Sequence, residues 1–202
     1  LASQLRLKNL EKESIAIKKT ESIKVKDVSF SLNYSLLKLE KSDNFPSNFN
    51  HFINRQKRRL KRILSKYQYN TMFYEIESSN FPIEKIKKLR IQMIELEIRN
   101  HKFLDDDLIS LTENLYNAGV LVVYEVLVEN NTTAISLIFK KDYYYSFWID
   151  LFNDQQMMNL VSNTAFIKKN TKENSATFNF GRGDYSYKIQ NFGPKVIPLF
   201  EL

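Results

Sequence analysis

The chain has 202 residues, 43% of them hydrophobic and 13% aromatic, so it holds enough apolar side chains for one sizeable core or two small ones. It contains no cysteine, which excludes disulfide frameworks, thiolate nucleophiles and cysteine-based metal sites, and its two histidines stand apart in the sequence, so we predict no metal site. The formal net charge of +7 predicts an anionic partner: nucleic acid, a phosphate-bearing cofactor or an acidic membrane surface.

The first fifty residues are rich in Lys, Glu and Ser and contain one candidate strand, at residues 28–39. The chain begins with a leucine, and we expect residues 1–50 to be the remnant of a preceding half-domain or an N-terminal extension. The longest apolar run, near residues 120–128, is interrupted by Glu125 and is far shorter than the roughly 20 residues that cross a bilayer. The start also lacks a signal-peptide core, so we expect a cytoplasmic protein.

Residues 54–66 carry seven Lys or Arg and no acid, with Leu60, Ile63 and Leu64 at helical spacing. This pattern predicts an amphipathic helix with one strongly cationic face. That face could bind RNA phosphates, including those of a tRNA, or anionic lipid, and it also fits a solvated helix in a basic protein. Alternating apolar and polar residues at 69–78 then predict a strand.

Two helices are expected next. A long one over residues 81–103 has Pro82 in its first turn and most of its apolar residues on one side, including Ile91 and Leu96. A second helix over 105–118 begins with three aspartates, which suit the positive helix start, and Gly119 suits a left-handed exit.

Three β-rich runs follow, at residues 120–129, 132–141 and 143–152, and the short polar connections between them predict an antiparallel meander. After it we expect a helix over 153–170, a strand over 175–180, a glycine turn and a last strand in 193–202, which Pro194 and Pro198 would confine to a sheet edge. This order predicts an α+β fold rather than an alternating parallel one.

The segment FNFGRGDYSYK, residues 178–188, holds two of the four glycines of the chain. Gly181 and Gly183 permit positive φ angles, while Arg182 and Lys188 could clamp a phosphate or carboxylate that Asp184 helps to orient. The alternative is a tight turn at a strand end, with Tyr187 in the core and Arg182 paired with Asp184.

This segment, after a helix and a meander, resembles the acyltransferase domain of the FemAB-like and CelD-like branch of the GNAT superfamily. The matching positions are Phe180, Gly181, Gly183, Asp184, Tyr187 and Lys188, with Asn179 where the family has aspartate. The resemblance covers roughly residues 50–195. It implies a GNAT-like mixed sheet, with an antiparallel meander flanked by helices, in a domain of residues 51–202.

The resemblance also implies transfer of an acyl group from acetyl-CoA or another acyl-CoA, or from aminoacyl-tRNA, to an amine or hydroxyl of a sugar or cell-envelope precursor. Acyl-CoA enters such folds in a slot between the third meander strand and the strand at 175–180, which implies cofactor binding at Asp150, Leu151 and Phe152. Related enzymes open the next helix with a small-residue turn that binds pyrophosphate. This chain has no glycine there, and Asp154 would repel phosphate or cap the helix, so the cofactor site could be altered or lost.

Acyl transfer needs a base for the attacking group and a proton donor. The candidates are Glu125 as base and Tyr187 as donor, with Arg182, Gly183, Asp184 and Lys188 binding the acceptor. A solvent-facing Glu125 on an amphipathic strand is the simpler interpretation. The aromatic run from Tyr143 to Trp148 could line a substrate groove or stack on a sugar or a nucleic-acid base, or simply alternate between core and surface. A non-catalytic binding or scaffold module with the same fold is the alternative function.

Overall fold

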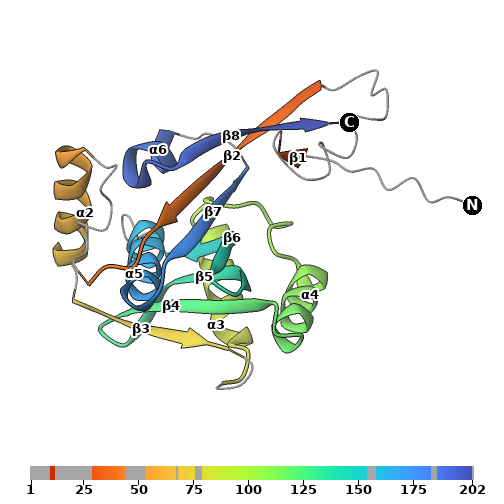
Figure 1. The fold of residues 1–202 in the computed structure, drawn as a ribbon. Helices are drawn as coiled ribbons and strands as arrows, with labels where there is room; N and C mark the ends of the chain where they lie inside the picture. The colour runs from red at the N-terminus through yellow and green to blue at the C-terminus, as the bar shows by residue number, and fades with distance from the viewer. Residues whose placement is uncertain are drawn as a thin grey trace, which may run out of the picture. The chain divides into compact units, whose positions relative to one another are not determined.

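The computed structural model describes residues 10–11, 29–43, 53–66, 68–75, 79–153, 158–182 and 186–201 (Figure 1). The chain divides into two compact units, one of Leu1–Leu37 with Asn179–Leu202 and the other of Lys38–Phe178. The predicted domain boundary between residues 50 and 51 lies outside the described residues and stays a prediction.

The larger unit is built on an antiparallel sheet of four successive neighbours: β3 (Tyr69–Tyr74), β4 (Leu121–Val128), β5 (Asn131–Lys141) and β6 (Tyr144–Phe152). The register places Val123 between Tyr74 and Leu137. Glu129 and Asn130 both take positive φ angles, as a tight two-residue hairpin turn requires. The predicted meander and the strand before it are therefore confirmed.

Two helices cover one face of this sheet: α3 (Ile83–Glu95) and α4 (Asp106–Asn117). A core cluster joins their apolar sides to inward-facing side chains of the strands; its members include Ile86, Leu89, Met93, Ile109, Val123, Leu137 and Leu151. The side chain of Asp105 caps α4 by accepting a hydrogen bond from the Leu108 N–H at 3.0 Å, and Gly119 has a φ of 72°. Both helix-terminus predictions for α4 are confirmed.

The prediction that the first of these helices runs to residue 103 is wrong. Helix α3 ends at Glu95, and Glu97 takes a left-handed φ of 57°. The N–H groups of Ile98 and Arg99 both donate to the Met93 carbonyl, which closes the helix end and turns Ile98 back against the core. Ile91 is 50% exposed, so the apolar stripe is narrower than its sequence pattern predicts.

Helix α5 (Met158–Glu173) covers the opposite face of the sheet (Figure 1). It is buried almost all round, because it lies between the strands and the basic helix α2 (Asn54–Lys66), which contacts it. On the sheet side, the Phe166 ring meets those of Tyr124 and Tyr145, both at 5.1 Å between centroids. The predicted helix at 54–66 is confirmed with the same bounds, and the predicted helix at 153–170 is confirmed from Met158.

Strand β7 (Ala176–Arg182) follows α5 and is the neighbour of β6. At its beginning the Thr177 N–H donates to the Tyr143 carbonyl at 2.9 Å, and the Phe178 ring stacks on that of Tyr145. From Asn179 onward β7 belongs to the other compact unit. The predicted slot between the two strands therefore stays a prediction.

The smaller unit contains β1 (Leu10–Glu11), β8 (Lys195–Glu201) and most of β2 (Ser29–Leu39), in the order β1-β8-β2, together with helix α6 (Ser186–Phe192). The candidate strand at 28–39 is confirmed. The last strand is also confirmed, but its edge position is wrong, because β8 pairs with a strand on each side. Strand β1 pairs only with Leu199 and Phe200, so Pro198, which has no N–H, lies just beyond that pairing. Helix α6 was not among the predicted elements.

Candidate functional site

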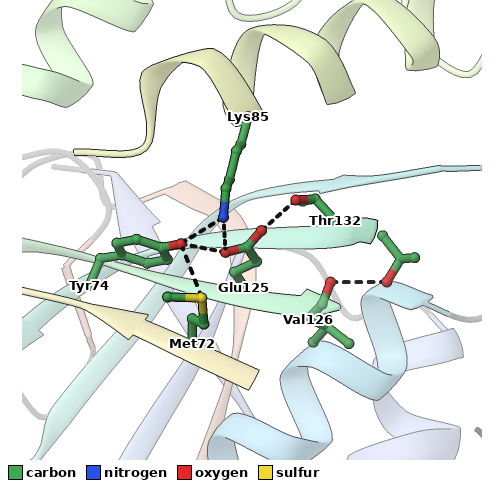
Figure 2. A network of polar contacts seen from close by, with 7 residues as sticks. Met72, Tyr74, Lys85, Glu125, Val126 and Thr132 are labelled. Atoms are coloured by element: carbon green, nitrogen blue, oxygen red, sulfur yellow. Dashed lines mark hydrogen bonds and ion pairs between the residues drawn. The ribbon is translucent and has the colours of Figure 1, made fainter. Parts of the chain in front are cut away.

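The predicted base, Glu125, lies in a network of polar side chains between β4 and α3 (Figure 2). Its Oε2 accepts hydrogen bonds from the Tyr74 hydroxyl at 2.5 Å and from Lys85 Nζ at 2.8 Å, and its Oε1 accepts one from the Thr132 hydroxyl at 2.5 Å. The side chain is 0% exposed. The interpretation of Glu125 as solvent-facing is therefore wrong, because α3 covers this face of the strand.

The network perturbs the ionisation of its members. Burial, followed by the hydrogen bond to Glu125, raises the pKa of Tyr74. Burial lowers the pKa of Lys85, but the hydrogen bonds and negative charge that this amine meets at Glu125 and Tyr74 together outweigh it, so its pKa is raised overall. Lys85 is thus held as a cation against a buried carboxylate, and Tyr74 is held as a neutral donor.

This arrangement ties four elements together, since Tyr74 comes from β3, Lys85 from α3, Glu125 from β4 and Thr132 from β5. Both carboxylate oxygens already accept protein hydrogen bonds, and of the three donors Lys85 is the most exposed, at 40%, while Thr132 is half-buried and Tyr74 is buried. A substrate proton would have to reach Glu125 through one of these donors. The geometry therefore supports a positioning role for this network, and direct base catalysis by Glu125 stays a prediction.

Buried phenols make the fold sensitive to alkali. Burial raises the pKa of Tyr124 and of Tyr145 to about 12, and the pKa values of Tyr69, Tyr74 and Lys85 are also raised. A group with a raised folded-state pKa stabilises the fold fully below its unfolded value, and this contribution is lost as the pH rises through the folded value. Burial lowers the pKa of Lys169, so this lysine makes the stability rise with pH. It is one group against the five whose raised pKa values make the stability fall.

We therefore expect the urea midpoint of unfolding to be flat near pH 8 and to fall between about pH 10 and 12. Unfolding followed by far-UV circular dichroism, alongside a tyrosinate absorbance titration, measures both quantities. A midpoint unchanged at about pH 11 would show that these tyrosines are not buried as described.

A second buried polar cluster surrounds Asp150 near the end of β6, on the α5 side of the sheet. The Ser136 hydroxyl on β5 lies 2.7 Å from Asp150 Oδ1, 2.9 Å from the Ser162 hydroxyl and 3.2 Å from Asn163 Oδ1. Asn163 Nδ2 donates to Asp150 Oδ2 at 3.2 Å. Ser136, Ser162 and Asn163 are buried, while Asp150 is half-buried. The cluster therefore fixes a partly accessible carboxylate at the end of the meander.

The three residues predicted to bind cofactor occupy different environments. Leu151 is fully buried in the core against α3 and α4, and Phe152 packs against the same cluster, with its N–H 3.4 Å from Met93 Sδ. The Leu151 side chain therefore faces away from α5, and the cofactor contacts predicted for Leu151 and Phe152 stay predictions. Asp150 alone of the three presents a polar side chain on the α5 face, and Asp154 lies outside the described residues.

The glycine segment is described only in part. Gly181 takes a φ of 73°, and its N–H donates to Asn179 Oδ1 at 2.8 Å, so the predicted need for backbone freedom is confirmed at that position. Arg182 ends β7, whereas Gly183 and Asp184 lie outside the described residues.

Helix α6 carries the last two candidates. Tyr187 is 50% exposed, so the alternative that placed it in the core is wrong. Lys188 is buried, and on the same helix buried Asn191 has a side-chain oxygen with no hydrogen-bond partner among the described residues. The roles predicted for Arg182, Gly183, Asp184, Tyr187 and Lys188 stay predictions.

Among the residues that the structure describes, no three His, Cys, Asp or Glu side chains gather in a way that could hold a metal ion. No helix among the same residues combines the length and the apolar character that crossing a bilayer demands.

Comparison with known proteins finds no matching family model and no matching curated protein, but it finds solved structures with the same fold. The C-terminal domain of a protein named as a lysylphosphatidylglycerol synthetase of Agrobacterium fabrum has a TM-score of 0.67 at 10% identity, over 96% of this chain and 65% of that one. L-PGS from Bacillus licheniformis has a TM-score of 0.64 at 10% identity, with the same coverage of each chain. FemX has a TM-score of 0.66 at 12% identity, over 96% of this chain and 70% of that one.

At such low identity the likeness shows the fold alone, and this chain spans 65% of the length of the first two of these structures. The predicted fold class, an α+β GNAT-like sheet with an antiparallel meander flanked by helices, is confirmed. The narrower FemAB-like or CelD-like branch stays a prediction.

Proposed function

We propose that this chain transfers an aminoacyl group from a charged tRNA to an amine or hydroxyl of a cell-envelope precursor, on the cytoplasmic side where charged tRNA is available. The observation that carries the proposal is the half-buried Asp150 carboxylate, held by Ser136 and Asn163 at the end of the meander. The fold shared with FemX, with L-PGS and with a domain of a protein named as a lysylphosphatidylglycerol synthetase supports it.

The sign of the charge at Asp150 favours an aminoacyl donor over acyl-CoA. An aminoacyl ester carries an α-ammonium group next to its reacting carbonyl, and a fixed carboxylate binds such a cation through a charge-assisted hydrogen bond. The pyrophosphate of acyl-CoA is anionic, and Asp150, like Asp154 in the following turn, would repel it.

The cationic helix α2 supplies a matching surface for the RNA. Its buried apolar side chains, Leu60 and Ile63, face the protein. Arg58 is exposed, and so are Lys61 and Arg62 about one helical turn further along. Membrane-bound amphipathic helices insert their apolar face into the lipid, and α2 already uses this face to pack against α5. An RNA backbone needs only the cationic face.

The transfer step can be written without a covalent enzyme intermediate. The acceptor amine or hydroxyl attacks the ester carbonyl, the new amide or ester bond forms, and the bond between the carbonyl carbon and the tRNA ribose oxygen breaks. The proton lost by the acceptor ends on that ribose oxygen. Asp150 holds the donor, and Tyr187 and Lys188 stay candidates for the proton donor and for acceptor binding.

Acyl-CoA is the second candidate donor, because the family resemblance implies it. The two donors are separated by calorimetric titration with acetyl-CoA, for which we expect no binding heat. Stoichiometric binding of acetyl-CoA, with no binding of tRNA, would replace the aminoacyl donor by acyl-CoA.

Reversing three charges on α2 tests the RNA surface. The variant Arg58→Glu/Lys61→Glu/Arg62→Glu is expected to weaken tRNA binding roughly 100-fold at about 0.1 M salt and to reduce the slope of log Kd against log salt by about three, because each reversed side chain loses one phosphate contact. Filter binding across a salt series measures both effects.

The matched control reverses the same charge elsewhere, as Lys87→Glu/Lys88→Glu/Lys102→Glu on and after α3. It should weaken binding only slightly, through net charge. Equal losses in the two triple variants would contradict a tRNA site on α2.

A further inference from the structure

A pocket of about 600 Å³ opens in the larger unit where three segments meet. They are residues 38–40 at the end of β2, the β5–β6 turn with its flanking residues 141–144, and residues 175–177 where β7 begins. The volume lies within the roughly 300–1,000 Å³ typical of small-molecule sites. Tyr143 and Tyr144, from the aromatic run that could line a substrate groove, are among its lining residues.

Backbone hydrogen bonds hold these walls together. The Thr177 N–H donates to the Tyr143 carbonyl at 2.9 Å, which fixes β7 to the β5–β6 turn. The Lys41 N–H donates to the Ser175 hydroxyl at 3.2 Å, and the Ser42 N–H donates to the Thr171 carbonyl at 3.0 Å. These two bonds fix the residues after β2 to the end of α5 and to the α5–β7 connection. The pocket is therefore formed before a ligand arrives, so binding would need little reordering of its walls.

Two exposed tyrosines are among the residues that line the pocket. Tyr143 is 54% exposed and Tyr144 is 40% exposed, whereas the next aromatic residue, Tyr145, is 5% exposed and packs in the core. The aromatic run thus alternates between core and surface from Tyr145 onward, but its first two members are surface rings beside a pocket. Exposed rings paired with polar neighbours are typical of binding surfaces, since each ring offers an apolar face and a hydroxyl.

The charges around the pocket cancel. Lys38 and Lys141 are matched by Glu40 and Asp142, in a protein whose net charge is +7. A balanced wall gives no net attraction for phosphates, nucleic acid or anionic lipid, which disfavours those ligands at this place. It does offer charged donors and acceptors, together with the hydroxyls of Ser175 and Thr177, to a ligand rich in neutral hydroxyl groups.

We infer that this pocket binds a neutral saccharide, whose apolar ring faces stack on Tyr143 and Tyr144 and whose hydroxyls bond to the surrounding charged side chains. The site is distinct from the proposed transfer site, because Asp150 lies six positions after Tyr144 on extended β6, about 20 Å along the strand. It goes beyond the proposed function and does not depend on it. A saccharide held here would anchor the protein to a glycan.

NMR titration with two neutral trisaccharides, chitotriose and maltotriose, tests the inference directly. At least one of them is expected to bind with a Kd of about 1 mM or lower, and to shift signals of residues that line the pocket. Tyr143→Ala and Tyr144→Ala should each raise that Kd roughly tenfold, because each removes one stacking surface. Ile91→Ala, which removes a similarly exposed apolar side chain outside the pocket lining, should leave the Kd unchanged.

Three outcomes would overturn the inference. The first is no binding of either trisaccharide at about 10 mM, tenfold above the expected Kd. The second is binding that both pocket variants retain at wild-type strength. The third is tighter, salt-sensitive binding of a sulfated disaccharide, which would show an anion site in place of a neutral one. All three readouts measure saccharide binding alone, so they are independent of whether the chain transfers aminoacyl groups.

Discussion

Replacing Lys85 with methionine is expected to lower the free energy of unfolding by about 2–3 kcal/mol, which corresponds to a fall in Tm of roughly 4–12 °C for a chain of this length. The substitution leaves the fully buried Glu125 carboxylate with hydroxyl donors only and no cation. Breaking a fully buried pair costs roughly 3–5 kcal/mol, and the 40% exposure of Lys85 reduces that value. Urea unfolding measures the change.

Two variants separate the network from a general loss of charge on α3. Lys88→Met removes an exposed lysine of the same helix and should change stability by less than about 0.5 kcal/mol. The double variant Lys85→Met/Glu125→Gln should recover at least half of the loss, because the buried charge is then gone. Equal stability of Lys85→Met and Lys88→Met would show that the contact with Glu125 does not hold the elements together.

Asp150→Asn is expected to lower kcat/KM for aminoacyl transfer by roughly 10- to 150-fold, the range that corresponds to a charge-assisted hydrogen bond of about 1.5–3 kcal/mol. Asparagine keeps the size of the side chain and still hydrogen-bonds with Ser136 and Asn163, so the fold should be retained. What it loses is the negative charge that pairs with the α-ammonium group of the donor. Transfer of labelled amino acid from charged tRNA measures the effect.

The donor itself supplies the sharper control. N-acetylation of the aminoacyl group removes its positive charge, so the wild-type protein should use N-acetyl-aminoacyl-tRNA poorly, and Asp150→Asn should use both donors about equally. Asp43→Asn, an exposed aspartate outside the cluster, should behave as wild type. If Asp150→Asn still prefers the free α-amino donor, Asp150 does not bind that group.

Local patterns explain how much of the fold could be predicted. Period-two alternation and short polar connections predicted the meander, and the acid-free run of cations predicted α2, because backbone geometry and turn chemistry decide these elements. The end of α3 was missed because the left-handed turn at Glu97 and the return of Ile98 to the core depend on tertiary packing.

The candidate site was harder to predict, because its residues meet only through the register and the covering helices. Alternation alone cannot tell a solvent-facing Glu125 from a buried one that pairs with a lysine of α3. The partners of Glu125 are also distant in the sequence, since Tyr74 lies fifty-one residues before it. Ser136 joins Asp150 across two strands, and Ser162 and Asn163 join them from α5. The sequence signal for this cluster was the hydroxyl of Ser136 inside the apolar run at 134–139.

The most direct test of aminoacyl transfer supplies the purified protein with a mixture of tRNAs charged with radiolabelled amino acids and a membrane fraction containing lipids and lipid-linked envelope precursors. We predict that label moves from tRNA into the organic-extractable fraction, that the Asp150→Asn variant largely abolishes this movement, and that labelled acetyl-CoA gives no product. Acetylation of that fraction from acetyl-CoA, with no transfer from any charged tRNA, would contradict the proposal.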